Sequence, residues 1–131
     1  MKIAVDTNVL VRAVVGDDPA QADRAARTLR DAELIAVSVP SLCVFVWVLI
    51  RVYAFAPADA AAAIRALLAA TNVEVNRPAV EAGLAILEAG GDFADGVIAY
   101  EGRWLGGETF VSFDRKAVHL LAAQGHSTAL L

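Results

Sequence analysis

The chain has 131 residues, of which 58% are hydrophobic and one is cysteine, and its formal net charge is -4. This length suits one ordinary domain, the single cysteine excludes an internal disulfide, and the acidic balance argues against binding nucleic acid through a basic surface alone. The longest apolar run, 42–50, is far shorter than the roughly 20 residues that cross a membrane, and without a signal peptide we expect a cytoplasmic protein.

Short apolar runs alternate with segments of helix-forming residues along the whole chain. Prolines stand near the starts of several helical segments and glycines close others, which is the usual punctuation of helices. The alternation predicts an α/β fold, a three-layer α/β/α sandwich around a central parallel sheet, as one domain over residues 1–131. The predicted strands are 2–5, 34–38, 73–75, 109–113 and 127–131, and the predicted helices open at Asp17 or Asp18, at Pro40 and at Pro57, and cover 77–91, 92–107 and 114–125.

Two aspartates stand where a parallel sheet binds ligands, beyond the carboxyl ends of its strands, and two more stand at the start of a nearby helix. Asp6 follows the first predicted strand and Asp114 follows the fourth, while Asp92 and Asp95 stand one turn apart at the start of the preceding helix. If the first and fourth strands are neighbours, Asp6 and Asp114 emerge at the same edge. Aspartate is also a common N-cap, so for Asp6, Asp92 and Asp114 taken singly, capping is the alternative interpretation.

Carboxylates that lie close together repel one another, and this repulsion must be offset, whereas a single capping aspartate has no such repulsion. Two carboxylates about 4 Å apart repel by roughly 4 kcal/mol at an effective dielectric near 20, a large share of the roughly 5–15 kcal/mol that stabilises a domain. Such a cluster therefore needs protonation or a cation. Oxygen ligands with open water positions favour Mg²⁺ or Mn²⁺, and sites of this kind most often serve phosphoryl chemistry.

Three segments together resemble the PIN domain and, more narrowly, the VapC group of bacterial toxin ribonucleases. They are "VDTNVL" (5–10), "DFADGVIAY" (92–100) and "FVSFDRKAV" (110–118). The resemblance implies a Mg²⁺- or Mn²⁺-dependent endoribonuclease that hydrolyses RNA phosphodiesters as the toxin of a type II toxin–antitoxin pair. It also implies a homodimer and a cognate antitoxin protein as partner.

The same resemblance implies roles for individual residues. Asp6, Asp95 and Asp114 would be the catalytic residues that hold the metal. Supporting roles near the metal would fall to Asp92, Thr7, Asn8 and Ser112.

An acid that the family carries is missing from this chain. Related sequences have glutamate near the start of the helix after the second strand, in the position that Val44 occupies within "LCVFVWVL". No Asp or Glu lies between Glu33 and Asp59 to take its role, which argues against a slipped alignment. The change removes an oxygen ligand and a negative charge, so it predicts impaired cleavage with folding retained. A deliberate or selected inactivation of a toxic gene and the decay of a natural copy are both open as its origin.

Basic residues offer several further candidates. Arg12 and Arg115, close in sequence to Asp6 and Asp114, are candidates for contacting RNA or balancing the carboxylates. The stripe of arginines in the second helical segment is either a solvated helix face or a phosphate-binding one. Structural roles are assigned to both histidines. The stripe consists of Arg24, Arg27 and Arg30, and the histidines are His119 and His126.

Two other functions are open on the sequence. A catalytically silent module would still bind RNA or the antitoxin but cleave nothing, and Val44 favours it. A phosphotransfer enzyme with an aspartyl nucleophile after the first strand would need a catalytic lysine. The chain contains only Lys2 and Lys116, and Lys116 follows Asp114 too closely for that role.

Overall fold

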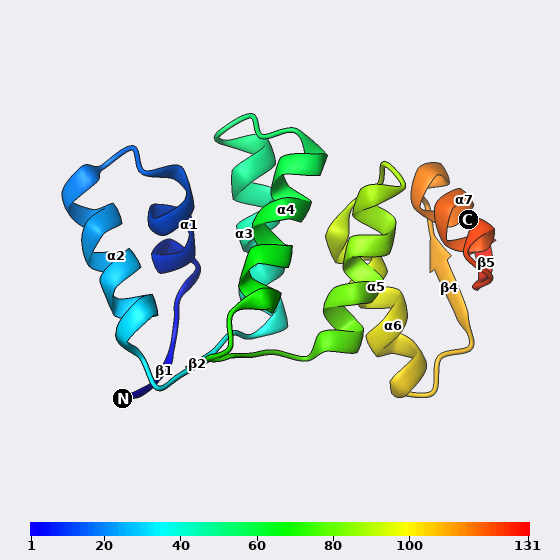
Figure 1. The fold of residues 1–131 in the computed structure, drawn as a ribbon. Helices are drawn as coiled ribbons and strands as arrows, with labels where there is room; N and C mark the ends of the chain where they lie inside the picture. The colour runs from blue at the N-terminus through cyan, green and yellow to red at the C-terminus, as the bar shows by residue number, and fades with distance from the viewer. The chain divides into compact units, whose positions relative to one another are not determined.

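Helices and parallel strands alternate from one end of the chain to the other (Figure 1). A computed structural model describes all residues, 1–131. They form two units, 1–76 and 77–131, and each is described by itself. The predicted α/β class with parallel strands is confirmed, because every strand pairing is parallel. None of the helices combines the length and the apolar character needed to span a membrane.

The N-terminal unit is built on a three-stranded sheet in the order β1-β2-β3. Ile3 lies opposite Ile35, which in turn lies opposite Val73. Ile35 and Val73 are buried, as expected of a parallel sheet that is covered by helices. The strands are β1 (Lys2–Ala4), β2 (Leu34–Ala36) and β3 (Val73–Glu74), each shorter than its predicted segment.

The helices of this unit begin where proline and capping residues direct them. Asp18 caps the second helix by accepting a hydrogen bond from the backbone N–H of Gln21 at 3.1 Å, and Ser38 caps the third by accepting from that of Ser41 at 3.3 Å. Proline occupies the first turn in both, where its missing N–H removes no helical hydrogen bond. The helices are α1 (Thr7–Val15), α2 (Pro19–Asp31), α3 (Val39–Arg51) and α4 (Pro57–Ala69).

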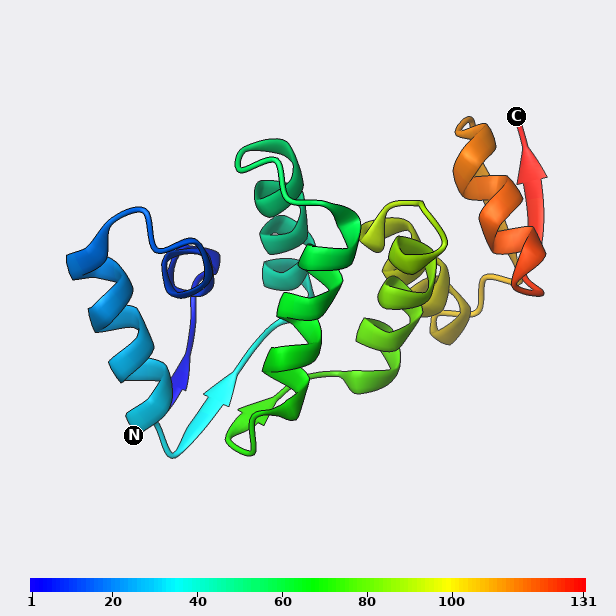
Figure 2. The same cartoon turned by 45° about the horizontal axis from the view of Figure 1, so that its top comes forward.

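The C-terminal unit packs three helices around a pair of parallel strands. Its core contains Ile86, Ala99 and Leu121, with Phe110 and Leu120 packed against them. Figure 2 shows the last helix lying beside the last strand. The elements are α5 (Arg77–Glu88), α6 (Phe93–Trp104), β4 (Thr109–Ser112), α7 (Arg115–Ala123) and β5 (Ser127–Leu130).

Helix α6 packs closely against α5 because Gly96 has no side chain. A Cβ at position 96 would overlap the backbone carbonyl of Ala82 and come within 2.9 Å of the Cα of Gly83. Backbone atoms cannot move aside as the end of a flexible side chain can. Since Gly96 directly follows Asp95, this contact also fixes the first turn of α6, which carries the Asp95 carboxylate.

The close approach of the two helices predicts opposite effects for two glycine substitutions in α6. We expect Gly96→Ala to destabilise the protein by about 1–3 kcal/mol, the usual effect of overpacking. Gly102→Ala is the matched control, because a Cβ there meets no atom within 4 Å, and it should stabilise the helix by about 0.5–1 kcal/mol. Urea unfolding of both variants measures the difference. Equal effects would contradict the packing described for Gly96.

Candidate functional site

Asp6 connects β1 to α1 and does not cap the helix that follows it. It occupies the N-cap position with extended backbone angles, yet its side chain accepts no capping hydrogen bond. The residue is exposed, and its carboxylate forms no ion pair. Capping therefore does not explain this aspartate, and both of its oxygens are available to a ligand.

The start of α1 is tied to the start of α3 by a side-chain hydrogen bond. The hydroxyl of Thr7 donates to the carbonyl oxygen of Ser41 at 3.1 Å. Val44 lies three residues after Ser41, on the same face of α3. The hydrogen bond thus holds the segment that begins with Asp6 beside the face of α3 that carries Val44. Sequence reasoning assigned Thr7 a place near the metal but did not identify Ser41 as its partner.

Val44 lies on an exposed face of α3 although its sequence neighbours are apolar. Leu42, Phe45 and Leu49 are buried on the opposite face. Val44 is 50% exposed and Trp47 is 58% exposed. Burial therefore does not require an apolar residue at position 44, and a glutamate there would keep its charge in contact with solvent.

Three carboxylates gather near the starts of α6 and α7 in the C-terminal unit. Asp95 is partly buried in the first turn of α6. Burial raises the pKa of Asp95, and the negative charges of Asp92 and Asp114 raise it further. The raised pKa shows that the charged form of Asp95 is held at an energetic disadvantage, as expected where perturbed groups form a functional site.

Asp114 and Asp92 both precede helices but use their side chains differently. Asp114 accepts a hydrogen bond from the backbone N–H of Ala117 at 3.1 Å, so the capping interpretation holds for one of its oxygens. The hydroxyl of Ser112 accepts a hydrogen bond from the Asp114 backbone N–H at 2.9 Å, which fixes the turn between β4 and α7. The Asp92 side chain forms no capping hydrogen bond.

The donor chemistry of these acids suits a hard divalent cation. Asp95 and Asp114 present carboxylate oxygens that repel each other, and a cation between them would remove that repulsion. Nowhere does the structure arrange three or more His, Cys, Asp or Glu side chains as a complete metal-binding group. Within the C-terminal unit, the residues fit a partial ligand set that needs further donors.

The two arginines proposed to contact RNA differ in their surroundings. Arg12 forms an ion pair with Asp17 at 3.2 Å, and the hydroxyl of Tyr53 donates to the other oxygen of Asp17 at 3.1 Å. These bonds hold Arg12 against the α1–α2 connection. Arg115 is the first residue of α7, is exposed, and forms no ion pair, so its guanidinium is available to an anion.

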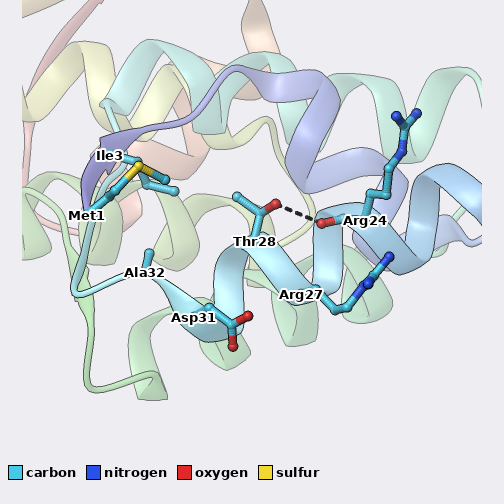
Figure 3. Close-up of a pocket in the computed structure, with 7 residues that line it drawn as sticks. All are labelled: Met1, Ile3, Arg24, Arg27, Thr28, Asp31 and Ala32. Carbon is cyan, nitrogen blue, oxygen red and sulfur yellow. Dashed lines mark hydrogen bonds between the residues drawn. The ribbon is translucent and has the colours of Figure 1, made fainter.

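The arginine stripe of α2 is largely neutralised by neighbouring acids. Arg27 pairs with Asp23 at 2.8 Å and Arg30 pairs with Asp31 at 3.0 Å, both at exposed positions that favour a solvated helix face. A pocket of about 410 Å³ adjoins the stripe. Figure 3 shows its apolar end and its arginine end, which are formed respectively by Met1, Ile3 and Ala32, and by Arg24 and Arg27.

Comparison with known protein families matches residues 3–120 to the PIN domain. The matched range runs from β1 into α7 and includes every residue to which the sequence assigned a site role. The chain has no match among curated proteins.

The charged form of Asp95 is disfavoured in the folded protein, so we predict that Asp95→Asn stabilises the metal-free protein. The gain should be about 0.2–0.5 kcal/mol at pH 7, as for like charges one helical turn apart. Because folding raises the pKa of Asp95, the ionised group weakens stability above that raised pKa, and the effect disappears as the pH falls toward the ordinary value. Urea unfolding in EDTA between pH 7 and pH 4 tests this.

Asp59→Asn is the matched control for this substitution. Asp59 is likewise the third residue of its helix, so it shares the helix-dipole environment of Asp95, but it is exposed. Losing its negative charge near a helix N-terminus should be neutral or slightly destabilising. The same gain in both variants would show that the surroundings of Asp95 do not specifically disfavour its negative charge.

Proposed function

Because this chain belongs to the PIN domain family, a family of nucleases, we propose that it is the toxin of a type II toxin–antitoxin pair. Its activity in that role is Mg²⁺- or Mn²⁺-dependent hydrolysis of RNA phosphodiesters, as in VapC-type ribonucleases. The observation that carries the proposal is the placement of Asp95, which is partly buried in the first turn of α6. Burial raises its pKa most, and the negative charges of Asp92 and Asp114 raise it further. A site that binds a divalent cation accounts for carboxylates kept together in this way.

The proposed metal ligands are Asp6, Asp95 and Asp114, with Asp92 as an auxiliary acid. Asp6 supports this assignment because its carboxylate neither caps α1 nor forms an ion pair. Asp114 also supports the assignment, because only one of its carboxylate oxygens caps α7 and the other remains available to a cation. Together the three residues supply hard oxygen donors and three negative charges, which suits Mg²⁺ or Mn²⁺ with open positions for water.

Other residues of the chain would position these ligands and the substrate. When bound, the cation supplies the Lewis acidity that phosphodiester hydrolysis requires. Ser112 holds the backbone of Asp114, and Thr7 holds the start of α1 against α3. Arg115 offers an unpaired guanidinium that suits bidentate capture of an RNA phosphate. Asn8 is exposed beside Asp6 and offers an amide to solvent or substrate.

Val44 makes this chain an impaired member of the proposed class. A valine on an exposed face, beside the segment that begins with Asp6, stands where we propose that the missing glutamate belongs. Without that acid, the site has fewer oxygen donors and less negative charge, so it should bind the cation more weakly. The same observation favours the second candidate function, a silent PIN homologue that binds RNA or the antitoxin without cleavage.

The antitoxin and a second copy of the chain are the proposed protein partners. Both rest on the likeness to VapC toxins. Large apolar side chains at exposed positions support them, since exposed apolar surface commonly marks contacts with other proteins. These side chains include Trp47, Trp104 and Leu105.

Restoring the missing carboxylate should restore cleavage. We expect Val44→Glu to cleave RNA at least about 10–100-fold faster in Mn²⁺ than the natural sequence, since losses of that size follow even from removing supporting residues of metal sites. Val52→Glu is the matched control, because Val52 is also exposed but lies at the other end of α3. Initial rates on a fluorescently labelled RNA of mixed sequence provide the measurement.

Two further conditions connect any gained activity to the proposed ligands. EDTA should abolish the cleavage by Val44→Glu, and adding Asp114→Asn to that variant should return the rate to that of the natural sequence. Equal rates for the natural sequence, Val44→Glu and Val52→Glu would show that position 44 does not belong to the site.

The toxin assignment predicts an effect on growing bacteria. Induced expression of Val44→Glu should arrest growth, because cleaved RNA stops protein synthesis, while the natural sequence and Val44→Glu/Asp95→Asn should be tolerated. Growth curves at matched protein levels test this. Active cleavage in vitro without growth arrest would retain the nuclease assignment and contradict the toxin assignment.

A further inference from the structure

A small pocket with an apolar floor and a few polar side chains lies in the C-terminal unit, away from the aspartates. It has a volume of about 230 Å³ and opens where α6 ends and β4 and β5 begin. Thr109 starts β4 at this pocket, whereas Asp114 follows the opposite end of the strand. The volume lies below the range of about 300–1,000 Å³ that is typical of drug-sized ligands. It suits a small ion or a single group that projects from a larger molecule.

Two basic side chains line this pocket without an acidic partner. Arg103 stands in the last turn of α6, and its guanidinium forms no hydrogen bond or ion pair with the protein. His126 precedes β5 and lines the same pocket as Arg103, and burial together with the charge of Arg103 lowers its pKa. Glu108, a carboxylate at the same pocket, forms an ion pair with neither.

Two hydroxyl groups add a further donor. Thr109 and Ser127 are opposite each other in the β4–β5 pairing, and their side-chain oxygens are 3.1 Å apart. In such a pair one hydroxyl donates to the other, so the proton of the accepting hydroxyl remains available. The pocket therefore offers a guanidinium fork, an imidazole N–H and a hydroxyl, which are all groups that donate to oxygen acceptors.

We propose that this pocket binds a phosphate group. Arg103 captures two phosphate oxygens in the bidentate geometry that suits guanidinium, and His126 with one of the two hydroxyls donates to a third. The phosphate is either a free phosphate or part of an RNA strand. The RNA form rests on the proposed nuclease function, because Arg103 lies eight residues after Asp95 in α6, about 12 Å along the same helix.

Calorimetric titration with inorganic phosphate tests the pocket directly. The titration is done in EDTA at pH 7, against chloride at the same ionic strength, so that neither metal nor cleavage contributes. We expect Arg103→Gln to weaken phosphate binding at least about tenfold and Glu108→Gln to strengthen it, because that change removes a repelling charge. Arg51→Gln, which alters an exposed arginine in α3, is the matched control and should bind as the natural sequence does.

Each outcome decides the proposal. Phosphate that binds the natural sequence and Arg103→Gln equally, or that does not bind at all, overturns it. If Arg103→Gln also weakens binding of a short single-stranded RNA and phosphate competes with that RNA, the pocket takes a phosphate of the strand. If only phosphate binding is lost, the ligand is a free phosphate. An inactive Val44→Glu variant would overturn the nuclease proposal without changing the phosphate result, since the titration requires no cleavage.

Discussion

The unfavourable environment of the partly buried Asp95 carboxylate is the constraint around which the candidate site is organised. Burial withdraws water from this carboxylate, and Asp92 and Asp114 add negative charge beside it. The fold maintains this arrangement, because Gly96 lets the first turn of α6 press against α5 and Ser112 fixes the turn that carries Asp114. A domain that keeps repelling charges together loses stability by doing so, and the proposed binding of a cation would compensate for the loss.

The apolar run in α3 has a physical explanation in the two faces of that helix. One face, with Phe45 and Leu49, lies in the core, whereas Val44 and Trp47 point outward. The outward face gains little from an apolar side chain, so packing does not explain the valine. Its place beside the segment of Asp6, set by the hydrogen bond from Thr7 to Ser41, is where a carboxylate would serve the proposed site.

The sequence predicts features that depend on local chemistry and misses those that depend on distant partners. Proline and a capping residue mark the start of α2 at Pro19, and the structure confirms it. Strands end earlier than their apolar runs because pairing, which the sequence does not show, decides where they stop.

The roles of the site residues were harder to predict from the sequence. Capping could not be assigned from residue type, since Asp6 and Asp114 both precede helices and only Asp114 caps one. Arg103 in α6 and His126 before β5 line one pocket because tertiary packing, which the sequence does not show, brings these elements together. The single domain over 1–131 and the joint role of Asp6, Asp95 and Asp114 stay predictions.

Paramagnetic broadening by Mn²⁺ tests most directly whether Asp6, Asp95 and Asp114 hold one cation. Amide NMR signals of the natural sequence would be followed during addition of substoichiometric Mn²⁺, with Asp95→Asn as the comparison. We expect the signals of residues 6–8, 94–96 and 113–115 to broaden together, and all of them to stay sharp in Asp95→Asn at the same Mn²⁺ concentration. Broadening near 95 and 114 with sharp signals near residue 6 would contradict a shared metal site.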